Sequence, residues 1–270
     1  MKTDPDPHRP SVARTSADAG IVRALTPRPR PGDGAPDPWA HRRGEPRTLT
    51  LLWSIFLMAL ATTTVFSVKL LGPRDPQAFQ PAARLMLTIA AAAMAVLWPM
   101  VRLSQTSPPR PLLAGITDLL AVNIPLQAVI WPLKLLTGWS FTILFAISAG
   151  LLSWSVLLGA LIAIGAAGRP GLGRTFWMAL ALAIVGAAPT AAALTAWAGG
   201  TPISLWPLGS PVTLPRALTA TPSGSPARMN DAEWIAIAAP ALAGLLWWSG
   251  NALWLALRPP FAPAKPSRVE

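Results

Sequence analysis

The polar residues that could do chemistry at membrane depth gather in one otherwise apolar segment, residues 112–136. This segment carries a carboxylate, two amides and an amine, from Asp118, Asn123, Gln127 and Lys134. On a regular helix, which turns about 100° per residue, the last three lie within roughly 40° of one another, and Asp118 lies about 140° from Asn123. Polar side chains in apolar surroundings are costly unless they are paired or bind an ion or a polar solute.

Two prolines, Pro125 and Pro132, interrupt the same segment. Proline donates no backbone hydrogen bond, and its ring clashes with the carbonyl four residues earlier, so the carbonyls of Ala121 and Ala128 are expected to be free. Transporters bind ions and polar solutes with discontinuous helices of this kind. The pattern therefore predicts a substrate or ion path formed by Asp118, Asn123, Gln127, Lys134 and, from the last apolar segment, Asn251.

A structural interpretation of these residues is also open. Asp118 lies about 9 Å along a helix from the start of the segment, so its carboxylate could reach water at the membrane interface. Asn123 and Gln127 could bond neighbouring helices, and Lys134 could extend to the lipid headgroups. A third arrangement is a re-entrant hairpin bent at Pro125, which would leave five crossings.

Catalysis within the membrane is not expected. The two histidines, His8 and His41, precede the first apolar stretch, the chain has no cysteine, and Asp118 is the one carboxylate at depth. A serine protease needs a serine facing a histidine, a zinc site needs several histidine, cysteine or carboxylate ligands, and an aspartyl site needs two carboxylates. We therefore predict no enzyme, no metal and no cofactor.

The composition predicts an all-α, polytopic transmembrane bundle. Apolar residues make up 52% of the 270 residues and charged residues 12%, which is about half the charged share of a soluble domain. Six apolar stretches are each long enough to cross a bilayer. The expected spans are residues 48–71, 85–103, 112–136, 139–167, 175–198 and 232–257.

The sequence outside these spans is polar. Residues 1–47 are rich in proline, arginine and aspartate and carry too few apolar residues to offset the entropy of ordering, so they predict a disordered basic tail. Residues 258–270 predict a short C-terminal tail. The connection of residues 199–229 contains six prolines and predicts a loop, in which residues 203–208 could rest at the membrane interface through Trp206.

Basic residues predict the orientation. With the N-terminus inside, 16 of the 22 lysines and arginines fall on the cytoplasmic side and six on the other. Cytoplasmic loops normally carry this excess, so both termini, including the C-terminal tail, are predicted to be cytoplasmic. The same distribution accounts for the net charge of +11 without a nucleic-acid partner. The bias toward alanine, arginine and proline is typical of a GC-rich bacterial genome and favours the bacterial inner membrane.

Small residues recur every four positions on two spans, a spacing typical of contacts between membrane helices. The positions are Gly159, Ala163 and Ala167 on the fourth span and Ala183, Ala187 and Ala191 on the fifth. The alanines of residues 90–93 give the second span a similar surface, and Pro189 is expected to kink the fifth.

The sixth span has a predicted start. Asn230 is a good N-cap, and Glu233 falls at the third helical position, which completes a capping box. Met229 and Trp234 are spaced as a hydrophobic staple. The helix should therefore begin close to residue 231.

Two functions are compatible with these residues. The first is a transport or permease-type component whose third segment lines a polar path; on this hypothesis Asp118→Asn removes activity and leaves assembly intact. The second is a structural or assembly subunit that docks partner helices, in which Gly159→Leu or Ala187→Leu prevents association. The expected partners are the lipid bilayer, other membrane subunits and, for an ATP-driven role, a separate ATPase, because the chain shows no nucleotide-binding pattern.

Overall fold

The computed structural model describes residues 46–69, 75–105, 111–167, 172–201, 205–220 and 229–257. Every regular element in these residues is a helix. Six of the described helices are long and apolar enough to cross a membrane, which confirms the predicted all-α, polytopic bundle. The tails predicted before residue 46 and after residue 257 lie outside the described residues.

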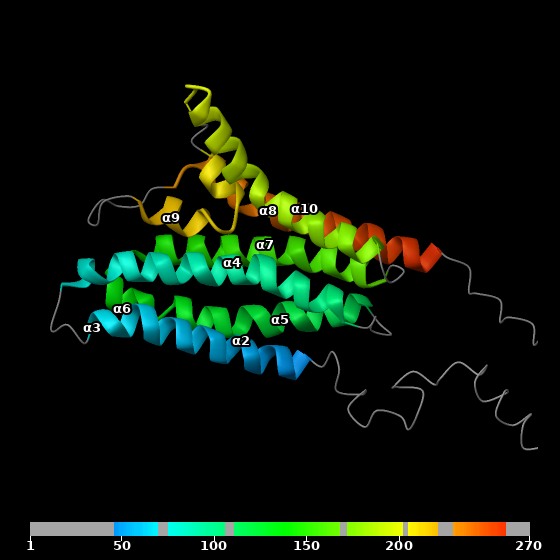
Figure 1. Cartoon of the computed structure of the whole chain (residues 1–270), viewed down its shortest axis with the longest axis horizontal. Helices are drawn as coiled ribbons and strands as arrows, with labels where there is room; N and C mark the ends of the chain where they lie inside the picture. The colour runs from blue at the N-terminus through cyan, green and yellow to red at the C-terminus, as the bar shows by residue number, and fades with distance from the viewer. Residues whose placement is uncertain are drawn as a thin grey trace, which may run out of the picture. The chain divides into compact units, whose positions relative to one another are not determined.

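The described elements follow one another as antiparallel helices (Figure 1). In chain order they are α2 (Pro46–Ala61), the π-helical segment η2 (Thr62–Phe66), α3 (Ser67–Lys69), the 3-10 turn η3 (Pro76–Phe79), α4 (Gln80–Ser104), α5 (Pro111–Ile130), α6 (Leu133–Thr137), α7 (Phe141–Ala167), α8 (Leu172–Trp197), the 3-10 turn η4 (Trp206–Gly209), α9 (Leu214–Thr219) and α10 (Asp231–Leu257). We call the end where α2 begins and α4 ends the tail end, and the end where α4 begins the loop end. The second span begins at Pro76 rather than at residue 85, because proline is well accepted in the first turn of a helix.

Helix α7 lies at the centre of the bundle and contacts α4, α5, α8 and α10. Within its most apolar window 78% of the residues are buried, against 11% for α8. Glycines let neighbours approach it: a Cβ at Gly150 would lie 2.6 Å from Leu214, and one at Gly165 would lie 2.7 Å from Leu103. Close packing of this kind, rather than escape from water, holds helices together in lipid.

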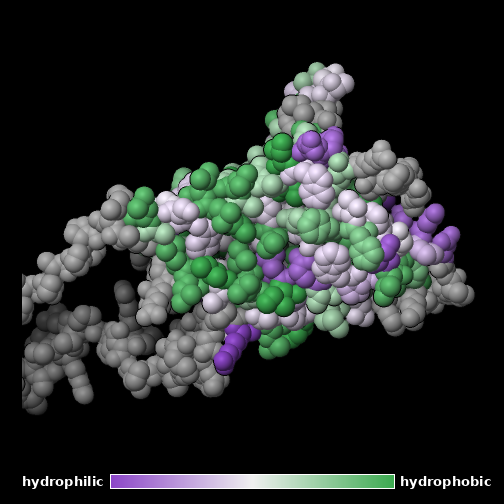
Figure 2. All heavy atoms as spheres, turned by 180° about the vertical axis from the view of Figure 1, so that it is seen from behind, coloured by the Kyte–Doolittle hydropathy of each residue, from purple (hydrophilic) through white to green (hydrophobic). Residues whose placement is uncertain are grey.

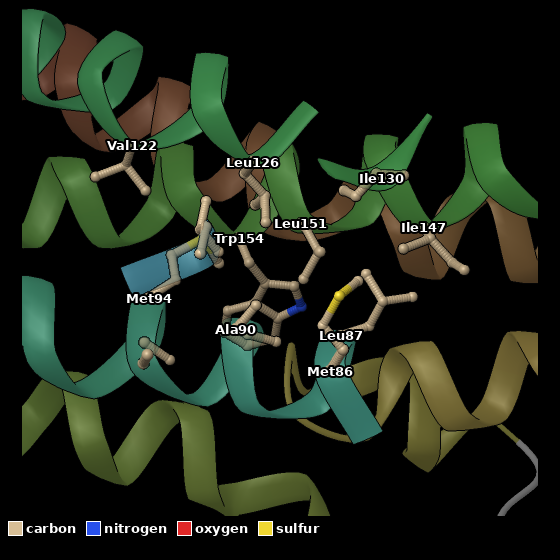
Figure 3. Packing of buried hydrophobic residues seen from close by; sticks show 14 of the residues in the cluster. Met86, Leu87, Ala90, Met94, Val122, Leu126, Ile130, Ile147, Leu151 and Trp154 are labelled. Atoms are coloured by element: carbon tan, nitrogen blue, oxygen red, sulfur yellow. The ribbon is translucent and has the colours of Figure 1, made fainter. Parts of the chain in front are cut away.

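The main core lies between α4, α5 and α7 (Figure 3). The indole of Trp154 on α7 reaches Ala90 on α4, both of which are buried. The alanine-rich centre of the second span therefore packs against a helix of the same chain, and its buried neighbours include Met86, Leu87, Met94, Val122, Leu126, Ile130, Ile147 and Leu151.

The third span is helical through Pro125 and is interrupted only at Trp131 and Pro132, before α6. The alternative arrangement, a re-entrant hairpin bent at Pro125, is not found, because the helix continues through this proline. Beside this proline, the indole N–H of Trp53 on α2 donates to the carbonyl of Val122 at 2.8 Å. A donor from the neighbouring helix thus supports the backbone of α5 where proline weakens its own hydrogen bonding. Helix α8 likewise continues through Pro189.

Part of the predicted 199–229 loop is folded. Elements η4 and α9 pack on the bundle, where Ser210 and Leu214 are fully buried. Arg84 on α4 donates to the carbonyl of Thr219, and its Nε donates to the Thr219 hydroxyl at 3.0 Å. The sequence prediction failed here because Pro207 and Pro215 stand in the first turns of these elements, where proline starts a helix rather than ending one.

The predicted start of α10 is confirmed. The backbone N–H of Glu233 donates to the Asn230 side-chain oxygen, and the backbone N–H of Asn230 donates to the Glu233 carboxylate, both at 2.8 Å. Met229 and Trp234 pack against the same small cluster around Leu214. The helix begins at Asp231, as the capping box predicts.

Replacing Asn230 with alanine should cost about 1 kcal/mol, because the first turn of α10 loses a side-chain acceptor for its backbone N–H groups. Hydrogen exchange at Glu233 and Trp234 should then become faster by about fivefold, which corresponds to that free energy. Asn230→Asp keeps the acceptor and serves as the control. Equal exchange in both variants would contradict a role for the cap.

Candidate functional site

Asp118 on α5 forms an ion pair with Arg102 on α4 near the tail end. Nε and Nη2 of Arg102 donate to the two carboxylate oxygens, and both side chains are buried. Asp118 is only 2% exposed. The expectation that its carboxylate reaches interfacial water is therefore wrong, since a guanidinium on the adjacent helix stands at the same level and takes the place of water.

The ion pair belongs to a polar cluster that links three helices. Arg102 also donates to the side-chain oxygen of Gln105 at 2.8 Å, and Arg174 on α8 donates to the backbone carbonyl of Gln105 at 2.5 Å. One turn before Arg102, the buried indole of Trp98 lies over Gly159 on α7. A bidentate pair between arginine and carboxylate fixes geometry as well as charge, so the cluster holds α4, α5 and α8 together.

The two amides of the predicted polar stripe face α7. The Asn123 amide donates at 2.8 Å both to the Ser155 hydroxyl and to the carbonyl of Leu119. The side-chain oxygen of Gln127 accepts from the Ser148 hydroxyl at 2.5 Å. The bonds to Ser155 and Ser148 are contacts between neighbouring helices, as the structural interpretation requires, while the bond to Leu119 lies within α5.

Lys134 and Asn251 lie apart from those amides. The Lys134 ammonium donates to the carbonyl of Trp139 at 2.7 Å and lies 5.2 Å from the centre of the Phe141 ring, at the loop end. Asn251 lies in the last two turns of α10, and its buried side-chain nitrogen has no hydrogen-bond partner among the described residues. The structure thus brings Asn123 and Gln127 onto one face but does not join the five predicted residues in one site.

Some of the predicted small-residue positions pack against other helices of the chain, and others are exposed. On α7, a Cβ at Gly159 would lie 3.4–3.7 Å from Trp98, Trp248 and Leu119, and Ala163 is buried close to Gly115. These positions pack against helices of the same chain, while Ala167 at the end of α7 is exposed. On α8, Ala183 and Ala187 are exposed and Ala191 is half-buried.

The contacts between α7 and α10 were missed by the sequence analysis. The backbone N–H of Ala241 donates to the Ser153 hydroxyl at 2.7 Å, and the indole of Trp248 donates to the carbonyl of Val156 at 3.2 Å. Gly244 lies against the backbone of α7 itself. Pro240 inside α10 is the sequence feature that could have indicated these contacts. A proline weakens the helix hydrogen bonds around it and leaves backbone groups that a neighbouring helix can bond.

The outer surface of the bundle is largely apolar. Figure 2 shows apolar side chains across much of one face, and the exposed large ones on α2 include Leu51, Leu52, Ile55 and Met58. Exposed aliphatic side chains on helices of this length are suited to contact with lipid tails. No group of three or more histidine, cysteine or acidic residues that could hold a metal ion occurs in the described part of the chain.

Comparison with models of known protein families, with curated proteins and with solved structures finds no match. A functional proposal therefore depends on the geometry of these residues.

Proposed function

We propose that this multi-pass membrane protein is a structural or assembly subunit that docks a partner helix on the exposed small-residue face of α8. The face is defined by Ala179, Ala183, Ala187 and Thr190, all of which are exposed. They are spaced by four, four and three residues and so lie along one side of the helix. Small side chains on one side allow a second backbone to approach closely.

The observation that carries the proposal is the contrast between exposed faces. On α2 most outward positions are large, as in Leu52, Ile55 and Met58, which are 62%, 57% and 65% exposed. Bulky aliphatic side chains pack well against lipid tails. The middle of α8 instead presents alanines, which offer little surface to lipid and are typical of helix contacts.

Gly186 supports the same interpretation. A Cβ built there meets no neighbouring atom within 4 Å in the described structure, whereas one at Gly115 or Gly150 would lie 2.6 Å from a side chain. Glycine costs a helix about 1 kcal/mol relative to alanine, but among the exposed alanines of this face it leaves room for another backbone to approach. A partner helix on α8 would supply that approach.

The last turns of α8 stand away from the other helices (Figure 1). Leu194 and Trp197 are 59% and 87% exposed there. A partner helix packed along α8 would cover both the small-residue face and this projecting end. The proposal thus accounts for a membrane helix of which little is buried inside its own chain.

The transport hypothesis has less support. Asp118 is paired with Arg102, the Asn123 amide nitrogen donates to Ser155, and Gln127 accepts from Ser148, so a polar solute would have to displace these partners. The buried side-chain oxygen of Asn123 has no partner among the described residues. Helix α5 is also continuous beside those residues. The proposed role needs no such rearrangement.

The proposed location is the bacterial inner membrane with both termini in the cytoplasm. The distribution of 16 basic residues against six supports this orientation. It places the polar cluster of Arg102 and Arg174 near the cytoplasmic surface.

Ala187→Leu tests the docking face. Because Ala187 is exposed in the single chain, the larger side chain should leave the fold intact but reduce recovery of the partner subunit by about tenfold, equivalent to 1.4 kcal/mol. Proteins cross-linked to α8 in native membranes and purified with the tagged chain would be quantified by mass spectrometry. Ala59→Leu, at an exposed alanine of α2, is the matched control. Unchanged recovery with Ala187→Leu would refute the assignment of this face.

A further inference from the structure

An open apolar cavity of about 320 Å³ lies between α2, α4 and the α5–α6 segment toward the loop end. Its walls include Met58 and Val65 on the first span, Met86 on α4, and Ala128 and Pro132 on the third span. None of the described lining residues is charged, and Thr62 supplies the one polar side chain among them. The cavity does not involve α8 and is separate from the proposed docking face.

Two interruptions of regular α-helix meet at this cavity. The first is the π-helical segment η2, which contributes Thr62 and Val65. The second is the break at residues 131–132, which contributes Pro132. π-Helical turns are rare and occur frequently at functional sites, because they widen a helix and redirect its side chains. Their convergence sets this cavity apart from an ordinary gap between straight helices.

The π-helical turn is supported by its own side chains. The hydroxyls of Thr62, Thr63 and Thr64 donate to backbone carbonyls of the preceding turn at 2.8, 2.9 and 2.6 Å. Their protons are therefore used within the helix. Thr62 donates to the carbonyl of Met58, so its hydroxyl presents an acceptor to the cavity rather than a free donor.

The proline on the opposite wall also removes a donor. Pro132 has no N–H to offer the carbonyl of Ala128, and both residues line the cavity. Among the described residues of these walls, a ligand with an acidic headgroup would find no cation, and a ligand with carbonyl groups, such as a quinone, would find no free hydroxyl. The described walls, which are uncharged and offer no free hydrogen-bond donor, therefore favour a hydrocarbon chain over a polar group.

We propose that this cavity binds the acyl chain of a membrane phospholipid. An apolar cavity of about 150 Å³ accommodates benzene, so twice that volume holds roughly a dozen carbon atoms, the scale of an acyl-chain segment. Met58 and Met86 stand on different helices of the lining, and the flexible thioether side chain of methionine adapts to an irregular ligand. In the bilayer, phospholipid chains are the molecules that surround these spans, and the open side of the cavity admits one.

A photoreactive phospholipid tests the site. The chain would be reconstituted into phosphatidylcholine vesicles that contain a lipid with a diazirine in the middle of its acyl chain, and adducts would be mapped after irradiation. Met86, which lines the cavity and is only 1% exposed, should be labelled at least fivefold more than the exposed Leu245 and Leu246 of α10. Labelling that follows exposure alone, with α10 modified as strongly, would overturn the proposal.

A filled cavity provides the control. Ala61→Phe should reduce labelling at Met86 at least fivefold, because Ala61 lines the cavity, while Ala59→Phe on the same helix should not. Ala128→Phe fills the cavity from the opposite wall and should reduce labelling in the same way. If one of the two variants folds poorly, the other still provides the test. Unchanged labelling in the folded variants contradicts the site. Loss of labelling on addition of a long-chain quinone at equal mole fraction contradicts the assignment to phospholipid.

Discussion

Replacing Asp118 with asparagine should lower the free energy of unfolding by about 3–5 kcal/mol. The substitution leaves the Arg102 guanidinium, which is 9% exposed, without the carboxylate that binds two of its nitrogens. A buried charge that loses its carboxylate partner is much more costly than the loss of one neutral hydrogen bond. The midpoint of unfolding in mixed detergent micelles, followed by loss of helical circular dichroism, measures the effect.

A double substitution separates the cost of leaving Arg102 without its carboxylate from the cost of any change at residue 118. Arg102→Met together with Asp118→Leu removes both charges and should recover most of the stability that Asp118→Asn loses. The transport hypothesis predicts the reverse for the single variant, namely lost activity in a chain that folds and assembles normally. An Asp118→Asn protein as stable as the unmodified chain would therefore count against a structural role for the pair.

Gly244→Ala should cost about 3 kcal/mol, at the upper end of what overpacking usually costs. A Cβ at this position would lie 2.8 Å from the backbone nitrogen of Leu157 and 2.9 Å from the carbonyl carbon of Val156. Backbone atoms of a central helix cannot rotate away as a side chain can. The methyl group must therefore push α10 from α7 and weaken the hydrogen bond from Trp248.

The neighbouring Gly250 on α10 is the matched control. No described atom of another helix lies within 4 Å of its added Cβ, so Gly250→Ala should be neutral or stabilising by up to about 1 kcal/mol. The same unfolding measurement, with hydrogen exchange along α10, compares the two variants. Equal effects at both glycines would show that helix propensity rather than close approach governs this helix.

The sequence predicts the spans well, because membrane crossing depends on local properties, namely length and hydropathy. The start of α10 was predictable for the same reason, since Asn230 and Glu233 complete their hydrogen bonds within one turn. The ion pair was not, although Arg102 and Asp118 were both conspicuous. Arg102 had an adequate explanation as a positive charge beside the membrane, and only the packing of α4 on α5 places it against a carboxylate.

The small-residue spacing shows a similar division. It predicts that a helix face can be approached closely, but it does not identify the helix that approaches. Gly159 meets Trp98 and Trp248 of its own chain, whereas Ala187 on an equivalent pattern stays exposed. The folded segment around Leu214 was missed because its few apolar residues become buried only where they pack against Gly150 of α7, which is distant in the sequence. Which helix packs on a small-residue face therefore depends on long-range contacts that the local sequence pattern does not specify.

The ion pair between Arg102 and Asp118 also bears on how the chain enters the bilayer during synthesis. The two residues stand on consecutive spans, at the end of one and near the start of the next. A lone charge costs an inserting helix about 2.5–3.5 kcal/mol at its centre and less toward its ends, where these two residues stand. If α4 and α5 leave the translocon together as a helical hairpin, the opposite charges neutralise each other before either helix meets lipid alone, so this pair couples the insertion of the second span to synthesis of the third.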